Sequence, residues 1–473
     1  MTTIIIVVTV AYFALLLFVS RKAGGRGGNG AFFRGNRESP WWVVAFGMLG
    51  ASVSGVSFVS VPGMVGAQNM TYMQMCIGFF FGYIVVAYVL LPLYYRLNLT
   101  SIYTYLNLRF GGRAYHTGAS FFLLSKMLGA AARLYLVCLI IQEYVFPVLP
   151  FWVIACSTVC LIWLYTFRSG IKSVVWTDTL QTALLIAALV LICVRLCSLN
   201  GFSVSEAARF IAQSPHGQWF EWDDWASRQH FVKQFLSGIF IVIVMTGLDQ
   251  DMMQKNLTCR NLRDAQKDMC TYGVMFIPLN FLFLSVGVLL LALADKEGIV
   301  VPQRGDDILP LFCAQGYLGG AVQILFSMGI TAAAFSSADS ALTALTTSFC
   351  IDILNVERRR QPEVTRKLVH AAMALLFVGF ILLFKAANNS SVLDAVYTVA
   401  SYTYGPLLGL FSFGLFTKRT PQSSVVPFIC IAAPLFCLVL DAYTTAVLNY
   451  RFGYELLMLN GGLTFVGLYA ASK

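Results

Sequence analysis

Long apolar runs alternate with short polar connections from one end of the chain to the other. A helix needs about 20 mostly apolar residues to cross a bilayer, and thirteen runs come near that length. The pattern predicts an all-α polytopic membrane protein with about thirteen transmembrane helices. The predicted helices occupy residues 2–19, 41–67, 72–94, 117–145, 151–167, 174–196, 235–254, 272–294, 316–351, 368–384, 392–416, 425–448 and 454–470.

Two of these runs, the second and the seventh, contain residues that interrupt a transmembrane helix. The second contains Gly50, Pro62 and several serines, Ser54 among them, and the seventh contains Gly247 followed by Asp249. Backbone groups freed by such breaks are tolerated at membrane depth only where protein or a water-filled cavity satisfies them. Interrupted helices at matching positions of two halves mark the binding site of many transporters. We therefore expect a solute pathway between these two runs.

Counting five runs from each interrupted one divides the chain into four parts. We expect an N-terminal transmembrane helix at 1–20, a first five-helix repeat at 41–196, a second, inverted repeat at 230–417, and two C-terminal transmembrane helices at 424–473. This symmetry rests on the positions of the interruptions, because the residues show no convincing sequence repeat.

Composition agrees with the hydrophobic pattern. Of the 473 residues, 58% are hydrophobic and 11% are charged, against roughly 45–50% and about 25% in soluble domains. No polar stretch is long enough to form a separate soluble catalytic domain. We therefore expect the protein to perform its function within the membrane core.

The net charge of +10 reflects where the basic residues lie. If the N-terminus faces outward, the cytoplasmic loops contain 22 of the 32 lysines and arginines, and the outer loops contain eight. Cytoplasmic loops of membrane proteins are enriched in basic residues in this way. We therefore expect the N-terminus outside and the C-terminus in the cytoplasm, and we exclude nucleic acid as a partner. The first run has no basic flank before it, so we expect it to remain as an uncleaved anchor.

The polar residues within the ninth run form the first candidate site. Ser336, Asp339 and Ser340 stand at positions i, i+3 and i+4, so their oxygens share one helix face. Carbonyl oxygens released by the break near Gly50 and Val53 would complete a cage of oxygens for a sodium ion. A polar seam between helices is the alternative, but a carboxylate within the membrane is costly and usually functional.

A second carboxylate, Asp178, lies near the cytoplasmic start of the sixth run, with Gln181 one turn later. Asp178 would help sodium to leave toward the cytoplasm or would complete a second ion site. Alternatively, it would cap its helix or pair with a loop arginine. The sequence leaves these alternatives open.

The seventh run ends in a polar stretch formed by Asp249, Gln250, Asp251 and Gln254, followed by Lys255. Asp249 lies deepest in the run and is expected, with Gln250, to face the solute pathway. Gln254 is expected to lie where the helix emerges into water.

Lys126 and Arg133 lie two turns apart inside the fourth run. A guanidinium at this depth would bind a carboxylate of the solute through two parallel hydrogen bonds. It would equally serve as a structural partner of Asp249 or Asp178. The sequence does not separate these two roles.

Other chemistry has no visible site in the sequence. The four histidines and twelve cysteines lack the spacings of metal or redox motifs, and no serine lies in a G-x-S-x-G elbow. We therefore expect no enzymatic activity, no cofactor, no metal other than sodium as coupling ion, and no obligate protein partner.

The polar motifs follow one another in the order of a known family. They are FFRG at 32–35 with PWW at 40–42, WTD at 176–178 with Gln181, DQ at 249–250 with QK at 254–255, SSADSAL at 336–342, and GPLLG at 405–409 with KR at 418–419. With these motifs the chain resembles the sodium:solute symporter family, which includes bacterial sodium-coupled galactose, proline and sialic-acid transporters.

The resemblance implies a leucine-transporter-type fold of two inverted five-helix repeats with one extra N-terminal helix. It also implies alternating access driven by sodium, in a bacterial inner (plasma) membrane. Asp178 would match the carboxylate linked to sodium passage or to a second sodium. The implied main sodium site consists of the backbone carbonyls of Gly50 and Val53 with Ser336, Asp339 and Ser340.

Departures from the family pattern bear on the solute. Ser337 stands where a threonine is usual, and Asp249 stands where the sugar-transporting relatives have an asparagine that helps to bind sugar. Arg133 lies close to the position of the arginine that holds the carboxylate of sialic acid in relatives. The resemblance therefore favours a carboxylate-bearing solute such as an amino acid or sialic acid.

Together these observations predict a sodium-coupled secondary active symporter that imports a small polar organic solute across the lipid bilayer. The alternatives are a sugar symporter of the same family, a proton-coupled carrier, and a membrane solute sensor without transport. The residues expected along the solute pathway are Ser54, Arg133, Gln181, Asp249 and Gln250.

Overall fold

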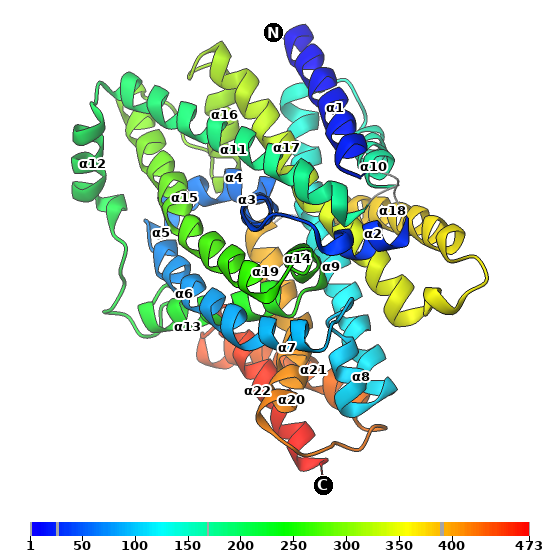
Figure 1. Cartoon of the computed structure of the whole chain (residues 1–473). Helices are drawn as coiled ribbons and strands as arrows, with labels where there is room; N and C mark the ends of the chain where they lie inside the picture. The colour runs from blue at the N-terminus through cyan, green and yellow to red at the C-terminus, as the bar shows by residue number, and fades with distance from the viewer. Residues whose placement is uncertain (1, 25–27, 168–169, 388–391, 473) are drawn as a thin grey trace.

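The computed structural model describes residues 2–24, 28–167, 170–387 and 392–472. Within these ranges nearly all secondary structure is helical, and β-type pairing is limited to two isolated bridges. The prediction of an all-α protein is therefore confirmed (Figure 1).

The helices differ widely in length. The longer ones are α1 (Thr2–Gly24), α6 (Tyr72–Val85), α9 (Gly112–Ile140), α10 (Phe151–Thr166), α11 (Ile171–Asn200), α15 (Leu262–Glu297), α17 (Gly320–Ser348), α18 (Pro362–Ala387), α21 (Val426–Leu448) and α22 (Leu456–Ala470). The shorter ones are α2 (Asn29–Arg34), α3 (Trp41–Ser52), α4 (Gly55–Gly63), α5 (Val65–Gln68), α7 (Leu91–Arg96), α8 (Thr104–Phe110), α12 (Val204–Gln213), α13 (Phe231–Val242), α14 (Gln250–Asn256), α16 (Ile308–Ala314), α19 (Val392–Thr403) and α20 (Gly405–Phe416).

Several of these helices are suited to cross a membrane. Among the described residues, seven are long and apolar enough, and the number rises to nine if each of two bent helix pairs counts as one span. Three further apolar helices, α10, α20 and α22, have only 10–17 residues. The chain is thus a multi-pass membrane protein, and the count of thirteen spans stays a prediction.

Both runs that the sequence predicts to be interrupted are broken helices. α3 and α4 are bent by 58° at the break between Ser52 and Gly55. α13 continues through a π-helical turn to Gly247 and then bends by 69° into α14. The two breaks are therefore confirmed, at the positions where glycine and polar residues interrupt the apolar pattern.

A third break contradicts the sequence-based boundaries. The sequence predicts one helix over 392–416, but the structure divides this run into α19 and α20 at Tyr404. The Tyr404 hydroxyl donates a hydrogen bond to Asp249, which directly precedes α14. The bend places Tyr404 beside the break between α13 and α14. The sequence does not predict it, because the run over 392–416 is mostly apolar.

Glycines allow α6 and α13 to approach each other closely. A Cβ atom at Gly78 would lie 2.2 Å from the carbonyl oxygen of Phe235, and one at Gly238 would lie 2.3 Å from that of Met75. Small residues let transmembrane helices approach until their backbones touch. This contact holds α13, the first half of the broken pair, against α6.

α11 contacts both α3 and α17 and thereby positions the interior polar residues. Gly50 of α3 makes the approach possible, because a Cβ atom there would lie 2.0 Å from the Thr182 hydroxyl oxygen of α11. That hydroxyl donates a hydrogen bond to the carbonyl of Phe46 at 2.8 Å. The start of α11, the middle of α17 and the break after α3 consequently lie next to one another.

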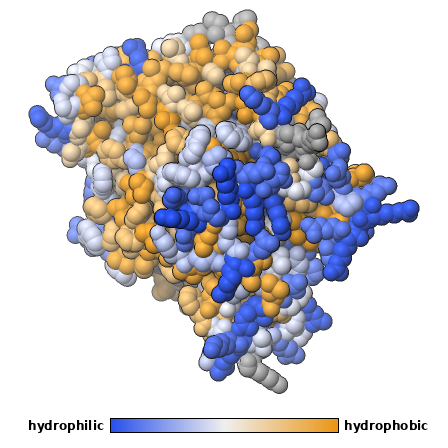
Figure 2. Space-filling view, in the orientation of Figure 1, coloured by the Kyte–Doolittle hydropathy of each residue, from blue (hydrophilic) through white to orange (hydrophobic). Residues whose placement is uncertain are grey.

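The surface shows where lipid and water meet the protein. In Figure 2 hydrophobic side chains cover much of the upper part of the view, and hydrophilic side chains gather in its middle, over α14 and α2. α21 exposes the large apolar side chains of Phe428, Leu435 and Val439. Extended apolar surface of this kind is typical of contact with a membrane.

Candidate functional site

The short helix α14 is the centre of the site. It has seven residues, all of them buried, and it contacts both α11 and α17. Its Asp251 forms an ion pair with Lys126 of α9. Because unpaired polar groups are costly to bury, the many polar side chains of α14 need partners inside the protein.

The first group of partners, which we name the ion cluster, consists of Asp178, Lys255, Ser336 and Ser340. The Lys255 ammonium lies 2.6 Å from Asp178 Oδ2, and both side chains are fully buried. Ser336 and Ser340, one turn apart on α17, donate hydrogen bonds to the two Asp178 oxygens at 2.8 and 3.3 Å. The predicted polar face of α17 therefore meets the carboxylate of α11, and a lysine ammonium is the cation beside it.

The structural alternatives that the sequence left open for Asp178 are wrong. Asp178 does not cap its helix, because α11 begins at Ile171. Its partner is Lys255 of α14 rather than a loop arginine. A role in sodium passage or in a second sodium site stays a prediction for this carboxylate.

Asp339 is hydrogen-bonded to a helix outside the ion cluster. Its Oδ2 accepts a hydrogen bond from Tyr165 of α10 at 2.7 Å, whereas Ser336 and Ser340 face Asp178. The other oxygen, Oδ1, is buried and has no hydrogen-bond partner among the described residues. The predicted ligand set on α17 is thus divided between two neighbouring helices, and one carboxylate oxygen is left for a further donor or cation.

Ser337 provides the contact between α17 and the break after α3. Its hydroxyl donates a hydrogen bond to the carbonyl of Ala51 at 3.2 Å. The released carbonyls near Gly50 and Val53 therefore lie close to α17, as the sequence predicts for this break. Sodium ligation by those two carbonyls stays a prediction.

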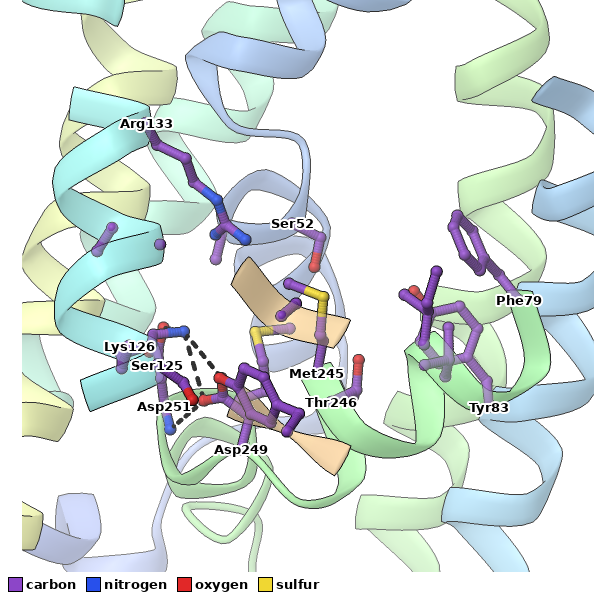
Figure 3. Close-up of a pocket in the computed structure, with 18 of the residues that line it drawn as sticks. Ser52, Phe79, Tyr83, Ser125, Lys126, Arg133, Met245, Thr246, Asp249 and Asp251 are labelled. Atoms are coloured by element: carbon purple, nitrogen blue, oxygen red, sulfur yellow. Dashed lines mark hydrogen bonds and ion pairs between the residues drawn. The ribbon is translucent and has the colours of Figure 1, made fainter. Parts of the chain in front are cut away.

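A cavity adjoins α14 and lies beside both broken helices (Figure 3). Its wall includes Ser52 at the end of α3, Thr246 before α14, and Tyr404 between α19 and α20. Phe79 and Tyr83 of α6 form part of the wall across from the charged residues (Figure 3). Apolar walls with a few convergent polar groups are usual for small-molecule sites.

The second group of buried charges, which we name the pocket cluster, consists of Lys126, Asp249 and Asp251. All three line the cavity, and the Lys126 ammonium lies 3.2 Å from Asp249 and 2.6 Å from Asp251. Asp249 also caps α14, because it accepts a hydrogen bond from the Asp251 N–H at 2.8 Å. Lys126 therefore neutralises part of the acidic start of α14.

Arg133 lines the same cavity two turns after Lys126. In the part of the chain that the structure describes, Arg133 forms no ion pair, whereas Asp249 is paired with Lys126 and Asp178 with Lys255. The structural pairing considered for Arg133 is therefore absent from this structure. Figure 3 shows its guanidinium pointing toward the space above the pocket cluster, where it is available to a carboxylate of a ligand.

Ser54 lies close to Arg133. Both line a small adjoining cavity, together with Ser337 of α17. Ser54 thus lies next to Arg133 and to the face of α17 that touches the break after α3.

Two glutamines predicted for the solute pathway lie outside the cavity wall. Gln250 accepts a hydrogen bond from the Ile102 N–H and donates one to the Thr100 carbonyl, both at 2.9 Å. Gln181 is buried near Tyr12 of α1. In this structure Gln250 anchors α14 to the loop before α8, and Gln181 lies at the contact between α11 and α1.

The prediction that Gln254 emerges into water is wrong. Its buried side chain donates hydrogen bonds to the carbonyls of Phe32 and Phe33 in α2, at 3.3 and 2.9 Å, and to the Thr347 hydroxyl at 3.0 Å. The polar end of this run lies inside the protein because α14 is the second half of a broken helix. It does not mark the surface end of a continuous helix.

Sequence reasoning missed the roles of Tyr165, Tyr404 and Lys255. Nothing local distinguishes Tyr165 and Tyr404 from the other tyrosines of apolar runs. Lys255 carried a signal, because it follows Asp251 by four residues, a spacing that puts two side chains on one helix face. The polar stretch at the end of the seventh run could therefore have been predicted to form a helix with Asp251 and Lys255 on one face.

Comparison with known proteins identifies similar sequences over most of the chain. The model of the sodium:solute symporter family matches residues 32–425. The sodium/sialic acid symporter SiaT of Proteus mirabilis is 25% identical over 442 residues, which cover 90% of this chain and 84% of that protein. The sodium/sialic acid symporter NanT of Aliivibrio fischeri is 26% identical over 413 residues, 84% of this chain and 79% of that protein.

Another similar protein is named for a different solute. The human sodium/iodide cotransporter is 27% identical over 425 residues, which cover 85% of this chain and 65% of that protein. The similar proteins are sodium-coupled transporters rather than enzymes, in agreement with the expectation from the sequence.

Solved structures share the fold. A Na⁺-coupled sialic acid symporter in a substrate-bound outward-open state matches with a TM-score of 0.84 at 22% identity, over 99% of both chains. Mhp1, a nucleobase-cation-symport-1 family transporter, matches with a TM-score of 0.57 at 13% identity, over 93% of this chain and 94% of that chain. The chain therefore has the fold of these membrane transporters.

Proposed function

Because this chain belongs to the sodium:solute symporter family, we propose that it couples the inward flow of sodium to the uptake of a small polar organic solute that carries a carboxylate. The observation that supports this solute class is Arg133, which lines the cavity between broken helices without an ion-pair partner among the described residues. Arg133 is half-buried, and a guanidinium removed in part from water is stabilised by a carboxylate partner, which the solute would supply.

The two bent helix pairs support transport by alternating access. Transporters with inverted repeats bind their solute near the membrane midplane, where discontinuous helices of both repeats meet. We assign α3 with α4 to the start of a first repeat, 41–196, and α13 with α14 to the start of a second repeat, 230–417. The cavity between them is then the solute site.

The ion cluster and Asp339 are the proposed sodium region, with the carbonyls of Gly50 and Val53. Sodium is a hard cation that prefers oxygen ligands, and hydroxyl, carboxylate and carbonyl oxygens meet in this region. One sodium ion that moves inward across 100 mV releases about 2.3 kcal/mol, which corresponds to roughly fifty-fold accumulation of solute per ion.

The proposed location is a bacterial inner membrane, with the N-terminus outside and the C-terminus in the cytoplasm. The excess of lysine and arginine in alternate loops supports this orientation. The sialic acid symporters of two bacteria make sialic acid one solute to test, beside amino acids and short carboxylates.

Uptake into proteoliposomes tests the proposal. Purified protein would be reconstituted and supplied with radiolabelled sialic acid, amino acids, short carboxylates and sugars, with an inward gradient of sodium chloride or of choline chloride. We expect uptake of one carboxylate-bearing solute in sodium only. Three results would contradict the proposal. Uptake that follows a proton gradient without sodium would indicate a proton-coupled carrier, and uptake of an uncharged sugar alone would indicate a sugar symporter. Solute binding without uptake would indicate a sensor.

A further inference from the structure

The helix α14 links the ion cluster to the solute cavity through side chains on one face. Asp251 and Lys255 are four residues apart on this helix, and such residues are neighbours on a helix surface. Asp251 forms its ion pair with Lys126 at the cavity, and Lys255 forms its ion pair with Asp178. Less than two helical turns therefore separate a contact of the solute site from a contact of the ion site.

Lys255 occupies the place that a monovalent cation would take beside Asp178. Its ammonium lies 2.6 Å from Asp178 Oδ2, and the Ser336 and Ser340 hydroxyls bind the same carboxylate. Two like charges a few ångströms apart repel strongly where water is excluded. A sodium ion that binds Asp178 closely would therefore compete with the ammonium for this carboxylate.

We propose that Lys255 is a tethered cation that neutralises Asp178 while sodium is absent, and that sodium displaces its ammonium from this carboxylate. This inference rests on the proposed function, in which sodium reaches the Asp178 region. It goes further by assigning a competitor of sodium within the chain itself. The competitor keeps the dry carboxylate paired when no ion is bound, since an isolated buried charge is very costly.

Displacement of Lys255 would change two other contacts that α14 makes. Asp251, one turn earlier, holds Lys126 in the cavity wall. Gln254, the neighbour of Lys255, holds the carbonyls of Phe32 and Phe33 in α2. A shift of α14 would therefore alter both the solute cavity and the contact with α2. Sodium and solute binding would then be coupled in both directions, as linkage requires.

A purely structural ion pair is the competing explanation, and sodium affinity separates the two. If Lys255 only supports the fold, its replacement lowers stability and leaves sodium affinity unchanged or weaker. If Lys255 competes with sodium, its replacement by a neutral residue makes sodium bind more tightly. The direction of the change in sodium affinity is therefore decisive.

The experiment measures equilibrium binding of ²²Na⁺ to the purified full-length protein, together with thermal unfolding in sodium chloride and in choline chloride. The test variant is K255Q, whose amide can still donate a hydrogen bond to Asp178 without a charge. We expect its sodium Kd to fall by about tenfold or more, and its melting temperature to rise more in sodium than that of the wild type. K255R, which keeps the cation, is expected to bind sodium as the wild type does.

A double variant tests whether the tighter sodium binding of K255Q depends on Asp178. D178N/K255Q removes both charges, so we expect it to fold and to lose the tighter sodium binding of K255Q. K255M, whose side chain has about the length of glutamine but is apolar, gives the same readout if K255Q is recovered unfolded. A wild-type protein that binds no sodium would contradict the proposed function. A wild type that binds sodium, with neutral variants that bind it no more tightly, would overturn the role of Lys255 alone.

Discussion

Lys126 and Lys255, the two lysines that are buried among the described residues, are held in different ways. Lys255 of the ion cluster has one carboxylate, Asp178, and neither side chain is exposed. Lys126 of the pocket cluster is shared by Asp249 and Asp251 at the wall of a cavity. At the ion cluster the charges balance as a pair, whereas the pocket cluster retains one excess negative charge next to the guanidinium of Arg133.

This difference separates charges that hold the fold from charges that await a ligand. Lys126 attaches one end of α14 to α9 and Lys255 attaches the other end to α11. Removal of Lys126 would leave two buried carboxylates without a cationic partner. Arg133 has no such partner in the described structure, although it lies on the same face of α9 as Lys126. We therefore expect substitutions of Lys126 to act on stability and substitutions of Arg133 to act on solute binding.

The largest effect is expected from Lys126→Met. It removes the cation shared by Asp249 and Asp251, and the loss of one partner of a buried ion pair costs about 3–5 kcal/mol. Thermal unfolding of the purified protein would show a lower melting temperature. The matched control is Lys172→Met, because Lys172 pairs with Glu38 at the surface and exposed pairs contribute about 0–1 kcal/mol. Equal melting temperatures for the two variants would show that the pocket cluster does not stabilise the fold.

The next effect is expected from Arg133→Met, and it concerns binding. Truncation of one partner of a buried, hydrogen-bonded charge pair costs about 2–5 kcal/mol, so the Kd for the carboxylate-bearing solute would rise by about thirty-fold or more. The melting temperature without solute would stay near that of the wild type. Arg133→Lys keeps the charge but loses the bidentate geometry, so it should bind the solute with intermediate affinity. An unchanged solute Kd with a strongly lowered melting temperature would assign Arg133 to the fold instead.

Much of this arrangement could be predicted from the sequence, because membrane insertion imposes strong constraints on composition. The apolar runs, the breaks after Ser52 and after Gly247, and the polar face of α17 all follow from residue types along the chain. Rare charges within apolar runs identified Arg133 and Asp178 as residues of interest. These features are local, and a sequence shows local features directly.

The pairing of the charges could not be predicted, because it depends on which helices meet. Asp178 and Lys255 are far apart in the chain, and either acid of the polar run could have paired with Arg133 on residue type alone. Gln254 was expected in water because a polar run at the end of an apolar one usually marks the surface. The fold instead buries it under α2, where backbone carbonyls accept hydrogen bonds from its amide nitrogen.

A smaller effect is expected from Tyr404→Phe, which acts on the pocket cluster without removing a charge. The Tyr404 hydroxyl donates a hydrogen bond to Asp249, and hydrogen bonds to charged groups contribute about 1.5–3 kcal/mol. We expect a modest decrease in melting temperature and a several-fold weaker solute affinity, because Tyr404 also lines the cavity. Tyr402→Phe is a suitable control, since its hydroxyl bonds Asp441 away from this cavity. If both variants behave alike, Tyr404 has no special role in the solute site.

The smallest effect is expected from Ser340→Ala, and it tests the ion cluster. Its hydroxyl donates a hydrogen bond to Asp178 at 3.3 Å. This bond is long for one to a carboxylate, so we expect its loss to cost about 0.5–1.5 kcal/mol, as for an ordinary hydrogen bond. The sodium concentration for half-maximal uptake would therefore rise by roughly two- to ten-fold, with little change in solute affinity at saturating sodium. Ser327→Ala is the matched control on the same helix, because its hydroxyl donates a hydrogen bond to the Gln323 carbonyl one turn earlier and to no other described residue. A shift in Ser327→Ala as large as in Ser340→Ala would mean that any lost hydroxyl on α17 loosens the helix. A shift in Ser340→Ala alone would link sodium to the face of α17 that meets Asp178, and would separate the ion cluster from the pocket cluster by function as well as by geometry.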